Sequence, residues 1–296
     1  MKTERANAKI NAYLDVTARR ENGYHDIVSI MQTVSLCDLV SVDYRPSSHT
    51  RIFLEASGND AMPTDCRNLA WRAAEKFLQR TERRGEVHII IEKHIPMAAG
   101  LAGGSTDAAA VLRALNALCG APLSAEELCA LGASLGADVP FCVRGGSARV
   151  TGIGERMEDI PTMPQGILLV ACRGEGVSTP WAYGELDRIY NGFCDRKNED
   201  NRYTCIENAW KSGDLNASCA HFYNIFEEVV PTVQKDVNAI KEIMLEAGAV
   251  HAMMSGSGPS VFGVFADADT ANAACERLRA SGAAAFVCHP CGKYKL

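Results

Sequence analysis

The sequence lacks the features of several large protein classes. No apolar run is long enough to cross a bilayer, and the first residues contain no apolar stretch of a secretory signal. We therefore expect a soluble, cytoplasmic protein without a membrane partner. A basic excess is also missing, since the net charge is −6, which argues against nucleic acid as the main partner.

The cysteines lack the spacing of disulfide frameworks and zinc sites. The chain has 12 cysteines scattered through apolar segments, which favours buried, reduced thiols. Cys288 and Cys291 form a single Cys-x-x-Cys pair, but no second pair follows at zinc spacing. We interpret this pair as structural. The sequence identifies no metal ligands.

The length of the chain predicts two domains, because 296 residues exceed what one hydrophobic core usually supports. Glycines and prolines cluster without periodicity over residues 145–164, which marks the best boundary. We expect domains of residues 1–155 and 156–296. Neither an internal repeat nor a low-complexity tract is evident.

Apolar periodicity predicts an α+β protein. In the first half, strands are expected over residues 8–16, 27–34, 39–44, 51–54 and 87–93, and helices over 68–79, 108–118 and 124–135. In the second half, strands are expected over 167–171, 251–254, 261–265 and 283–288, and helices over 207–210, 233–246 and 270–280. Alternation in the first strand puts Lys9 and Asn11 on one face.

A glycine-rich loop lies between a predicted strand and a predicted helix. Its glycines let backbone N–H groups converge on an anion, the helix N-terminus adds partial positive charge, and Ser105 and Thr106 supply hydroxyls. This pattern predicts a phosphate-binding loop. An ordinary glycine turn with a Ser/Thr cap has the same composition, so the loop alone leaves both interpretations open.

Neither of the commoner nucleotide-binding loops fits, because Gly-x4-Gly-Lys-Ser/Thr is absent and no Gly-x-Gly-x-x-Gly follows the first strand. The loop resembles instead the second motif of the galactokinase, homoserine kinase, mevalonate kinase and phosphomevalonate kinase (GHMP kinase) superfamily. Residues 254–261, about 150 residues later, resemble its third motif. The resemblance implies ATP binding by Pro96, Met97, Ala98, Ala99, Gly100, Leu101, Ala102, Gly103, Gly104, Ser105 and Thr106.

Four further segments, residues 8–14, 19–25, 136–146 and 151–155, resemble the 4-diphosphocytidyl-2-C-methyl-D-erythritol kinase family. The resemblance implies transfer of the ATP γ-phosphoryl group to the 2-hydroxyl of a cytidyl substrate in non-mevalonate isoprenoid synthesis, with Mg²⁺ on the ATP. It also implies a two-domain GHMP-kinase fold. The N-terminal domain would resemble ribosomal protein S5 domain 2, and the C-terminal domain would be ferredoxin-like.

Lys9 and Asp138 fall on that family's catalytic pair. A carboxylate can accept the proton of an attacking hydroxyl, and an ammonium can keep the carboxylate ionised and offset phosphoryl charge. Without the motifs, a lysine on a strand usually lies on a solvated face and an Asp before Val-Pro is usually a turn residue.

The remaining site residues are likewise implied by the resemblance. Tyr24 and His25 fall on the cytosine-recognition positions, and Tyr183 on a second stacking position for which Trp181 competes. Asn68 and Lys93 fall on the adenine contacts, although an Asn before a helix can equally be an N-cap. The expected substrate-binding residues are Asn11, Tyr24, His25, Thr179 and Tyr183.

Two departures and two alternatives remain. Thr106-Asp107 stands where many superfamily members have Ser-Asn or Ser-Ser, and Thr106 keeps the hydroxyl. Ala102 stands where many superfamily members have glycine, which matters only if its φ is positive. The alternatives are another GHMP kinase, similar to homoserine or mevalonate kinase, and a non-catalytic nucleotide-binding protein on the same scaffold. Gly23-Tyr-His25 disfavours the first, and the presence of both Lys9 and Asp138 disfavours the second. The oligomeric state stays open.

Overall fold

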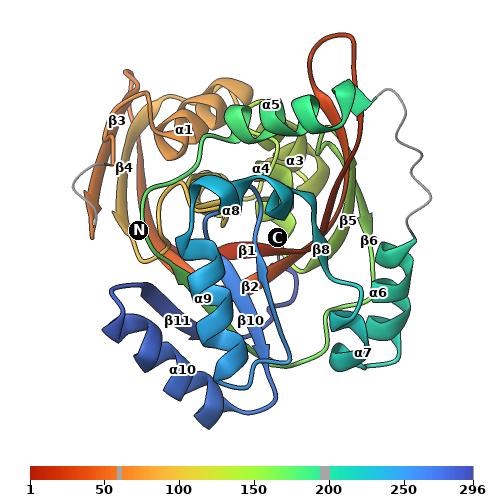
Figure 1. The fold of residues 1–296 in the computed structure, drawn as a ribbon. Helices are drawn as coiled ribbons and strands as arrows, with labels where there is room; N and C mark the ends of the chain where they lie inside the picture. Colours follow the sequence, from red (N-terminus) through yellow and green to blue (C-terminus); the bar gives the residue numbers. More distant parts are fainter. Residues whose placement is uncertain (59–61, 194–200, 296) are drawn as a thin grey trace.

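The computed structural model describes residues 1–58, 62–193 and 201–295 and shows an α+β protein with two sheets (Figure 1). The larger, seven-stranded sheet has the order β3-β4-β2-β1-β8, and β5 pairs with β2 and with β6. The smaller, four-stranded sheet has the order β11-β7-β10-β9.

Two long antiparallel strands, β1 (Lys2–Arg19) and β2 (His25–Pro46), form the centre of the larger sheet. The sequence predicted two strands where β2 is continuous, so that prediction was wrong in this detail. The first part of β2 pairs with β5 and its last part with β4. Polar residues between the two parts, Ser35 and Asp38, interrupt the alternation and hide the continuity of the strand.

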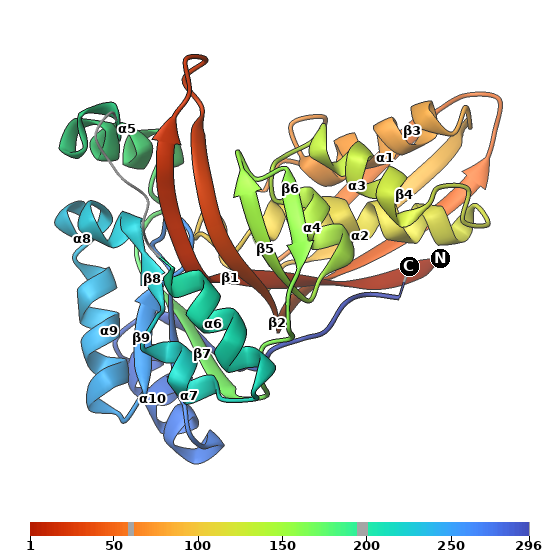
Figure 2. The ribbon, with the colours of Figure 1, turned by 90° about the vertical axis from the view of Figure 1, so that its right-hand side faces the viewer.

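Helices cover one face of the larger sheet (Figure 2). In the second half of strand β4, buried residues alternate with exposed ones, so one face of the strand is covered and the other faces solvent. The central helix α2 is buried without a break from Thr106 to Asn116, and its alanines allow close packing on the strands. The elements are β3 (Arg51–Ser57), α1 (Leu69–Arg80), β4 (Gly85–Glu92), α2 (Gly103–Leu118), α3 (Ala125–Ala133) and α4 (Val139–Arg144).

The segment over residues 145–164, which the sequence marks as the best boundary, contains two strands that its lack of periodicity did not indicate, β5 (Ser147–Gly152) and β6 (Arg156–Asp159). Both strands are short, and they are stabilised by the pairing of β5 with β2 and of β5 with β6, which no local pattern reveals. The division into residues 1–155 and 156–296 stays a prediction.

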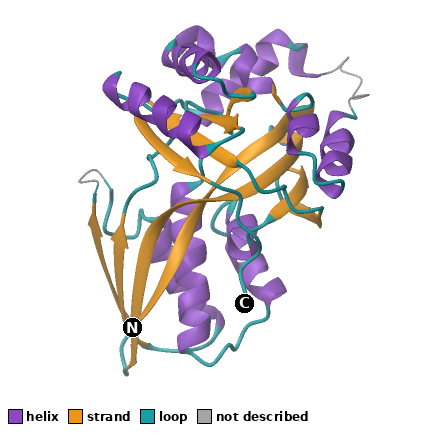
Figure 3. Cartoon of the chain, turned by 90° about the horizontal axis from the view of Figure 1, so that it is seen from below, coloured by secondary structure: helices purple, strands orange, loops and turns teal. Residues whose placement is uncertain are grey.

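The second half contributes the smaller sheet and also reaches back to the larger one, where β8 pairs with β1. Figure 3 shows the strands of the molecule side by side with helices packed along them. Most of the helix predicted over residues 233–246 is present as α9, and Val233 instead ends the short helix α8. The elements are β7 (Ile167–Cys172), α5 (Thr179–Ile189), η1 (Asn191–Phe193), α6 (Arg202–Lys211), α7 (Leu215–Cys219), β8 (Tyr223–Asn224), η2 (Ile225–Glu228), α8 (Val230–Val233), α9 (Asp236–Glu246), β9 (His251–Met254), β10 (Val261–Phe265), α10 (Ala268–Ala280) and β11 (Ala284–Cys288).

The C-terminal segment runs from β11 back to the larger sheet. Pro290 pairs with Val34, and the Cys291 N–H donates to the Thr33 carbonyl. In the described part of the chain, no group of three or more His, Cys, Asp or Glu side chains could hold a metal ion. No described helix is long and apolar enough to cross a membrane.

Candidate active site

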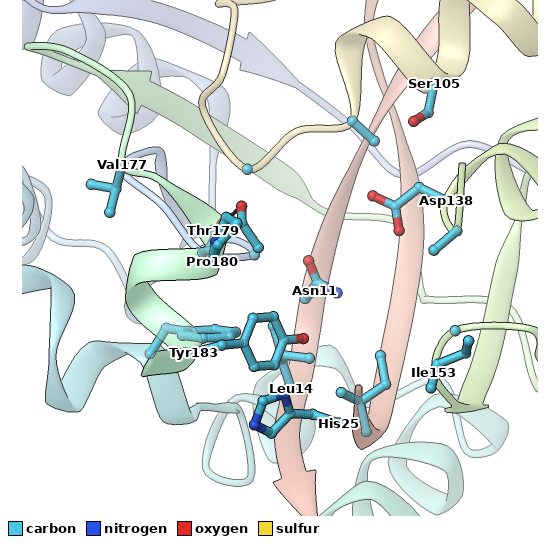
Figure 4. Close-up of a pocket in the computed structure, with 18 of the residues that line it drawn as sticks. Asn11, Leu14, His25, Ser105, Asp138, Ile153, Val177, Thr179, Pro180 and Tyr183 are labelled. Carbon is cyan, nitrogen blue, oxygen red and sulfur yellow. Dashed lines mark hydrogen bonds between the residues drawn. The ribbon is translucent and has the colours of Figure 1, made fainter. Parts of the chain in front are cut away.

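A cavity of about 800 Å³ lies where β1, the loop before α2, the start of α4 and the helix α5 meet (Figure 4). Side chains from both halves of the chain therefore face one space. Among the residues expected from the sequence, those lining it are Lys9, Asn11, Tyr24, His25, Ala98, Ala99, Gly100, Ala102, Gly103, Gly104, Ser105, Asp138, Thr179 and Tyr183.

Lys9 and Asp138 come together in this cavity. The Lys9 Nζ lies 3.8 Å from Asp138 Oδ2 and donates a 2.7 Å hydrogen bond to Asn11 Oδ1. The Asn11 amide in turn donates to the Ser29 hydroxyl at 2.8 Å, so its orientation is fixed. Because Lys9 is almost completely buried, the hydrogen bonds from Lys9 to Asn11 and from Asn11 to Ser29 hold the ammonium group in one position beside the Asp138 carboxylate.

Asp138 is the residue that precedes α4, yet its side chain makes no capping hydrogen bond. A carboxylate at this position usually accepts from the helix N–H groups. Here the side chain is about one-third exposed (34%) and points into the cavity, as Figure 4 shows. Both features leave an oxygen available to a ligand.

The glycine loop docks onto the turn that carries the third motif. The Ser260 N–H donates to the Ala99 carbonyl at 3.2 Å, and the Ser255 hydroxyl donates to the Gly100 carbonyl at 3.1 Å. On its other side, the loop accepts a hydrogen bond from the Lys9 N–H at the Leu101 carbonyl. The loop is thereby fixed next to the Lys9 side chain.

The N-terminus of α2 opens into the cavity. Gly103, Gly104 and Ser105 line the cavity and form the first turn of the helix, whose N–H groups have no partner within a helix. These groups and the helix dipole favour an anion. Ala102 precedes the helix at a φ of 59°, in the left-handed region, so the departure from glycine falls on a position that favours glycine.

Two residues of the glycine loop, Leu101 and Thr106, are buried in the protein and do not line the cavity. Thr106 is fully buried, and its hydroxyl donates to the Asn7 carbonyl at 2.7 Å. Leu101 is also buried, with 1% of its surface exposed. Any contribution of these two residues to ATP binding would therefore be to the shape of the loop, and their assignment stays a prediction.

A second cavity of about 250 Å³ adjoins the first at Gly103 and Gly104, and Asn68, Lys93 and Met97 line it. Asn68 is the N-cap of α1, because its side chain accepts from the Ala70 N–H. Asn68 can therefore be both the N-cap of α1 and an adenine contact, since the capping residue also lines this cavity. The other predicted loop residue, Pro96, is partly buried.

Lys93 lies between two buried carboxylates. It pairs with Asp38 and, at 2.8 Å, with Asp107. Burial lowers the pKa of Lys93, but the carboxylates of Asp107 and Asp38 outweigh it and raise that pKa above its usual value. Burial and the charge of Asp38 raise the pKa of Asp107 to about 7, although Lys93 opposes them. One oxygen of Asp107, Oδ1, has no hydrogen-bond partner among the described residues.

The predicted base-recognition residues line the end of the cavity away from the glycine loop. The ring of Tyr183 stacks on that of His25 with centroids 4.7 Å apart, and Tyr24, the residue directly before His25, is 60% exposed. Burial raises the pKa of Tyr183 to about 12. Trp181 packs against the core and is absent from the described residues that line the cavity, so Tyr183 is the better placed of the two rings.

Comparison with known proteins agrees with this geometry. Residues 68–146 match the family model "GHMP kinases N terminal domain", and residues 208–284 match "GHMP kinases C terminal". The 4-diphosphocytidyl-2-C-methyl-D-erythritol kinase of Caldicellulosiruptor saccharolyticus is 41% identical over 93% of this chain and 92% of its own length. That of Alkaliphilus metalliredigens is 40% identical over 93% of this chain and 91% of its own length.

This chain belongs to the 4-diphosphocytidyl-2-C-methyl-D-erythritol kinase family. A crystal structure of a 4-(cytidine 5′-diphospho)-2C-methyl-D-erythritol kinase superposes with a TM-score of 0.81 at 33% identity, covering 98% of this chain and all of the other. A homoserine kinase from Cytophaga hutchinsonii, 16% identical, has a TM-score of 0.74 and covers 98% of this chain and 94% of its own. The second likeness shows the fold alone. The expected α+β GHMP-kinase fold is confirmed.

The structure also places in the site two residues that sequence reasoning missed. Ser257 lines the cavity and shares a 2.8 Å hydrogen bond with Thr179, and Asp187 lines it beside His25. Ser257 lies within the third motif, so the motif carried a signal for it. Asp187 lies one helical turn after Tyr183, but no periodicity indicated the helix α5 that brings both residues to the cavity in this member of the kinase family.

Proposed function

We propose that this protein is an ATP-dependent kinase that phosphorylates the 2-hydroxyl of 4-diphosphocytidyl-2-C-methyl-D-erythritol. The observation that carries the proposal is the buried Lys9 paired with Asp138 in the cavity into which the glycine loop and the N-terminus of α2 open. Family membership supports the choice of substrate, since the relatives bear that name.

The proposed reaction uses the two charged groups in different ways. The oxygen of the substrate's 2-hydroxyl attacks the γ-phosphorus of ATP while an Asp138 oxygen accepts the hydroxyl proton. The bond from the γ-phosphorus to the β,γ-bridging oxygen breaks, which releases ADP. The Lys9 ammonium, held by Asn11, lies beside Asp138 and faces the charge on the transferred phosphoryl group.

The N–H groups of Gly103, Gly104 and Ser105 would bind the ATP phosphates at the N-terminus of α2. Mg²⁺ usually arrives on the phosphates of ATP with few protein ligands, so the partly exposed Asp138 carboxylate and the hydroxyls that line the cavity fit such an ion. When bound, it neutralises charge on the β- and γ-phosphates. Lys93 and Asn68 in the adjoining cavity would face the adenosine part.

The cytidine part would occupy the end lined by Tyr24, His25 and Tyr183, with Thr179 between base and phosphates. Aromatic rings beside a base contribute stacking of roughly 1–3 kcal/mol each. Asn11 has both ends of its amide engaged, so we assign it to positioning Lys9 as well as to lining the substrate cavity.

The test is a comparison of acceptors at fixed ATP and Mg²⁺. Purified protein is incubated with the cytidyl substrate, with mevalonate or with homoserine, and ADP release is measured while ³¹P NMR identifies the phosphorylated product. We expect a new phosphomonoester only with the cytidyl compound. Faster turnover of mevalonate or homoserine would leave a kinase with a different substrate, and binding of ATP without turnover of any acceptor would favour the non-catalytic alternative.

A further inference from the structure

A carboxylate holds the His25 imidazole at the base end of the cavity. The Nε2 of His25 lies 2.7 Å from Asp187 Oδ1, and the other oxygen of Asp187, Oδ2, lies 3.3 Å from the Arg19 Nε. The His25 side chain is only 8% exposed, and its ring is packed between Tyr183 and Phe193. The ring therefore has one orientation and one fixed partner.

This contact decides which nitrogen of the neutral imidazole carries the proton. An ionised carboxylate can only accept, so Nε2 must be the N–H that donates to Asp187. The other nitrogen, Nδ1, is then unprotonated and can only accept a hydrogen bond. Among the described residues, Nδ1 has no hydrogen-bond partner.

We propose that Asp187 is a specificity-determining residue, which makes His25 Nδ1 an acceptor and so selects a pyrimidine that presents an amino group over one that presents a carbonyl oxygen. Cytosine offers such a donor, whereas uracil has a carbonyl at the same position and would face a lone pair. The inference rests on the proposed function, because it assumes that the base lies beside His25. Asp187 acts through His25 and is a positioning residue.

Because Arg19 contacts Asp187, the substitution Asp187→Asn, which replaces one carboxylate oxygen by an NH₂ group, tests the inference. In Asp187→Asn, the amide can present either its oxygen or its NH₂ group to His25. The Arg19 guanidinium only donates, so it favours the amide oxygen on its own side and leaves the NH₂ group facing Nε2. Nε2 must then accept, and the proton moves to Nδ1, which becomes a donor that matches uracil.

The first measurement is the tautomer itself. Long-range ¹H–¹⁵N spectra of the full chain, labelled at histidine and recorded near pH 8, where an ordinary histidine is neutral, distinguish the two ring nitrogens. We expect His25 to be the Nε2–H form in the wild type and the Nδ1–H form in Asp187→Asn. The Nδ1–H form in the wild type would overturn the proposal, whatever the substrate of the enzyme.

The second measurement is base selectivity, read from the binding of CDP and UDP by calorimetry and from kcat/KM with cytidyl and uridyl substrates. We expect Asp187→Asn to reduce the cytosine-over-uracil ratio about 10- to 100-fold, because a mismatched buried polar pair carries most of such discrimination. Adding Arg19→Met to Asp187→Asn frees the amide to turn and should restore part of the ratio. ATP affinity should stay unchanged.

Asp26→Asn is the matched control, because Asp26 forms a similar pair with Arg20 in the same hairpin and is absent from the described cavity lining. It should leave the ratio at the wild-type value. A purely structural role of Asp187 predicts that CDP and UDP binding weaken equally, and an unchanged ratio in Asp187→Asn would overturn the proposal. Failure of the proposed function would appear separately, as a wild type that binds neither nucleotide.

Discussion

The Ser255 hydroxyl donates a hydrogen bond to the Gly100 carbonyl oxygen at 3.1 Å, and this contact joins two motifs that lie 155 residues apart in the sequence. Gly100 has a φ of +79°, and a Cβ on it would lie 2.1 Å from the Ser255 carbonyl oxygen. The phosphate-binding loop therefore keeps its shape by docking against the C-terminal half, and Gly100 is required both for its backbone conformation and for this close approach.

The first prediction compares two glycines of that loop. Gly100→Ala should separate the loop from residues 255–258 and lower the ATP affinity more than tenfold, because a Cβ cannot fit 2.1 Å from a backbone oxygen. Gly104→Ala is the control for folding, since its Cβ would meet only Leu69 at 3.8 Å, an ordinary contact. Calorimetry with an ATP analogue and thermal unfolding measure the two effects. Equal ATP affinity in Gly100→Ala and wild type would contradict the docking argument.

A second prediction concerns Ala102, whose φ of 59° lies in the left-handed region. An alanine in the left-handed region is destabilised by roughly 1–2 kcal/mol relative to one in the right-handed region. A glycine avoids this strain, but it raises the entropy of the unfolded chain, which lowers the free energy of unfolding by roughly 0.5–1 kcal/mol. Ala102→Gly should therefore stabilise the protein by up to about 1 kcal/mol in urea unfolding. Ala117→Gly, at an exposed position of the same helix, should destabilise it by about 1 kcal/mol. Effects of the same sign at both positions would contradict the assignment of strain to Ala102.

Much of this fold follows from periodicity, and the exceptions have physical reasons. The helix α2 and strand β4 combine strong patterns with a glycine loop between them, so both were predicted in place. The strands β5 and β6 were missed because their stability comes from pairing with β2. The motifs predicted that Lys9 and Asp138 would meet, whereas the roles of Ser29 and Asp187 depend on tertiary contacts that leave no mark in the sequence.

The third prediction tests the catalytic pair. Asp138→Asn should lower kcat by about 10²- to 10⁴-fold, the range for loss of a general base, and leave the affinity for an ATP analogue nearly intact. Lys9→Ala should show a similar loss. If the two groups act as a unit across their 3.8 Å separation, the double variant should be no worse than the worse single variant.

The control for this series is Asp159→Asn, because Asp159 pairs with Arg144 at the far end of the same short helix. It should leave kcat unchanged, which separates chemistry from disturbance of α4. Turnover of Asp138→Asn within a few-fold of wild type in a steady-state assay would remove Asp138 from the catalytic role. Strictly multiplicative losses in the double variant would mean that Lys9 and Asp138 act independently.

The last prediction follows from the buried cluster of Lys93, Asp38 and Asp107. Burial raises the pKa of Asp107 from 3.8 to about 7, so between these values the folded protein binds more protons than the unfolded chain. The free energy of unfolding must then fall as the pH rises through this window, by at most about 1.4 kcal/mol per pH unit for one proton. Asp107→Asn cannot titrate and should lack this fall. We expect the stability of wild type relative to the variant, measured by urea unfolding at several pH values, to decrease between about pH 4 and pH 7 and to level off above it. Parallel pH profiles for the two proteins would show that Asp107 is already ionised in the folded state at low pH, with Lys93 outweighing the effect of burial.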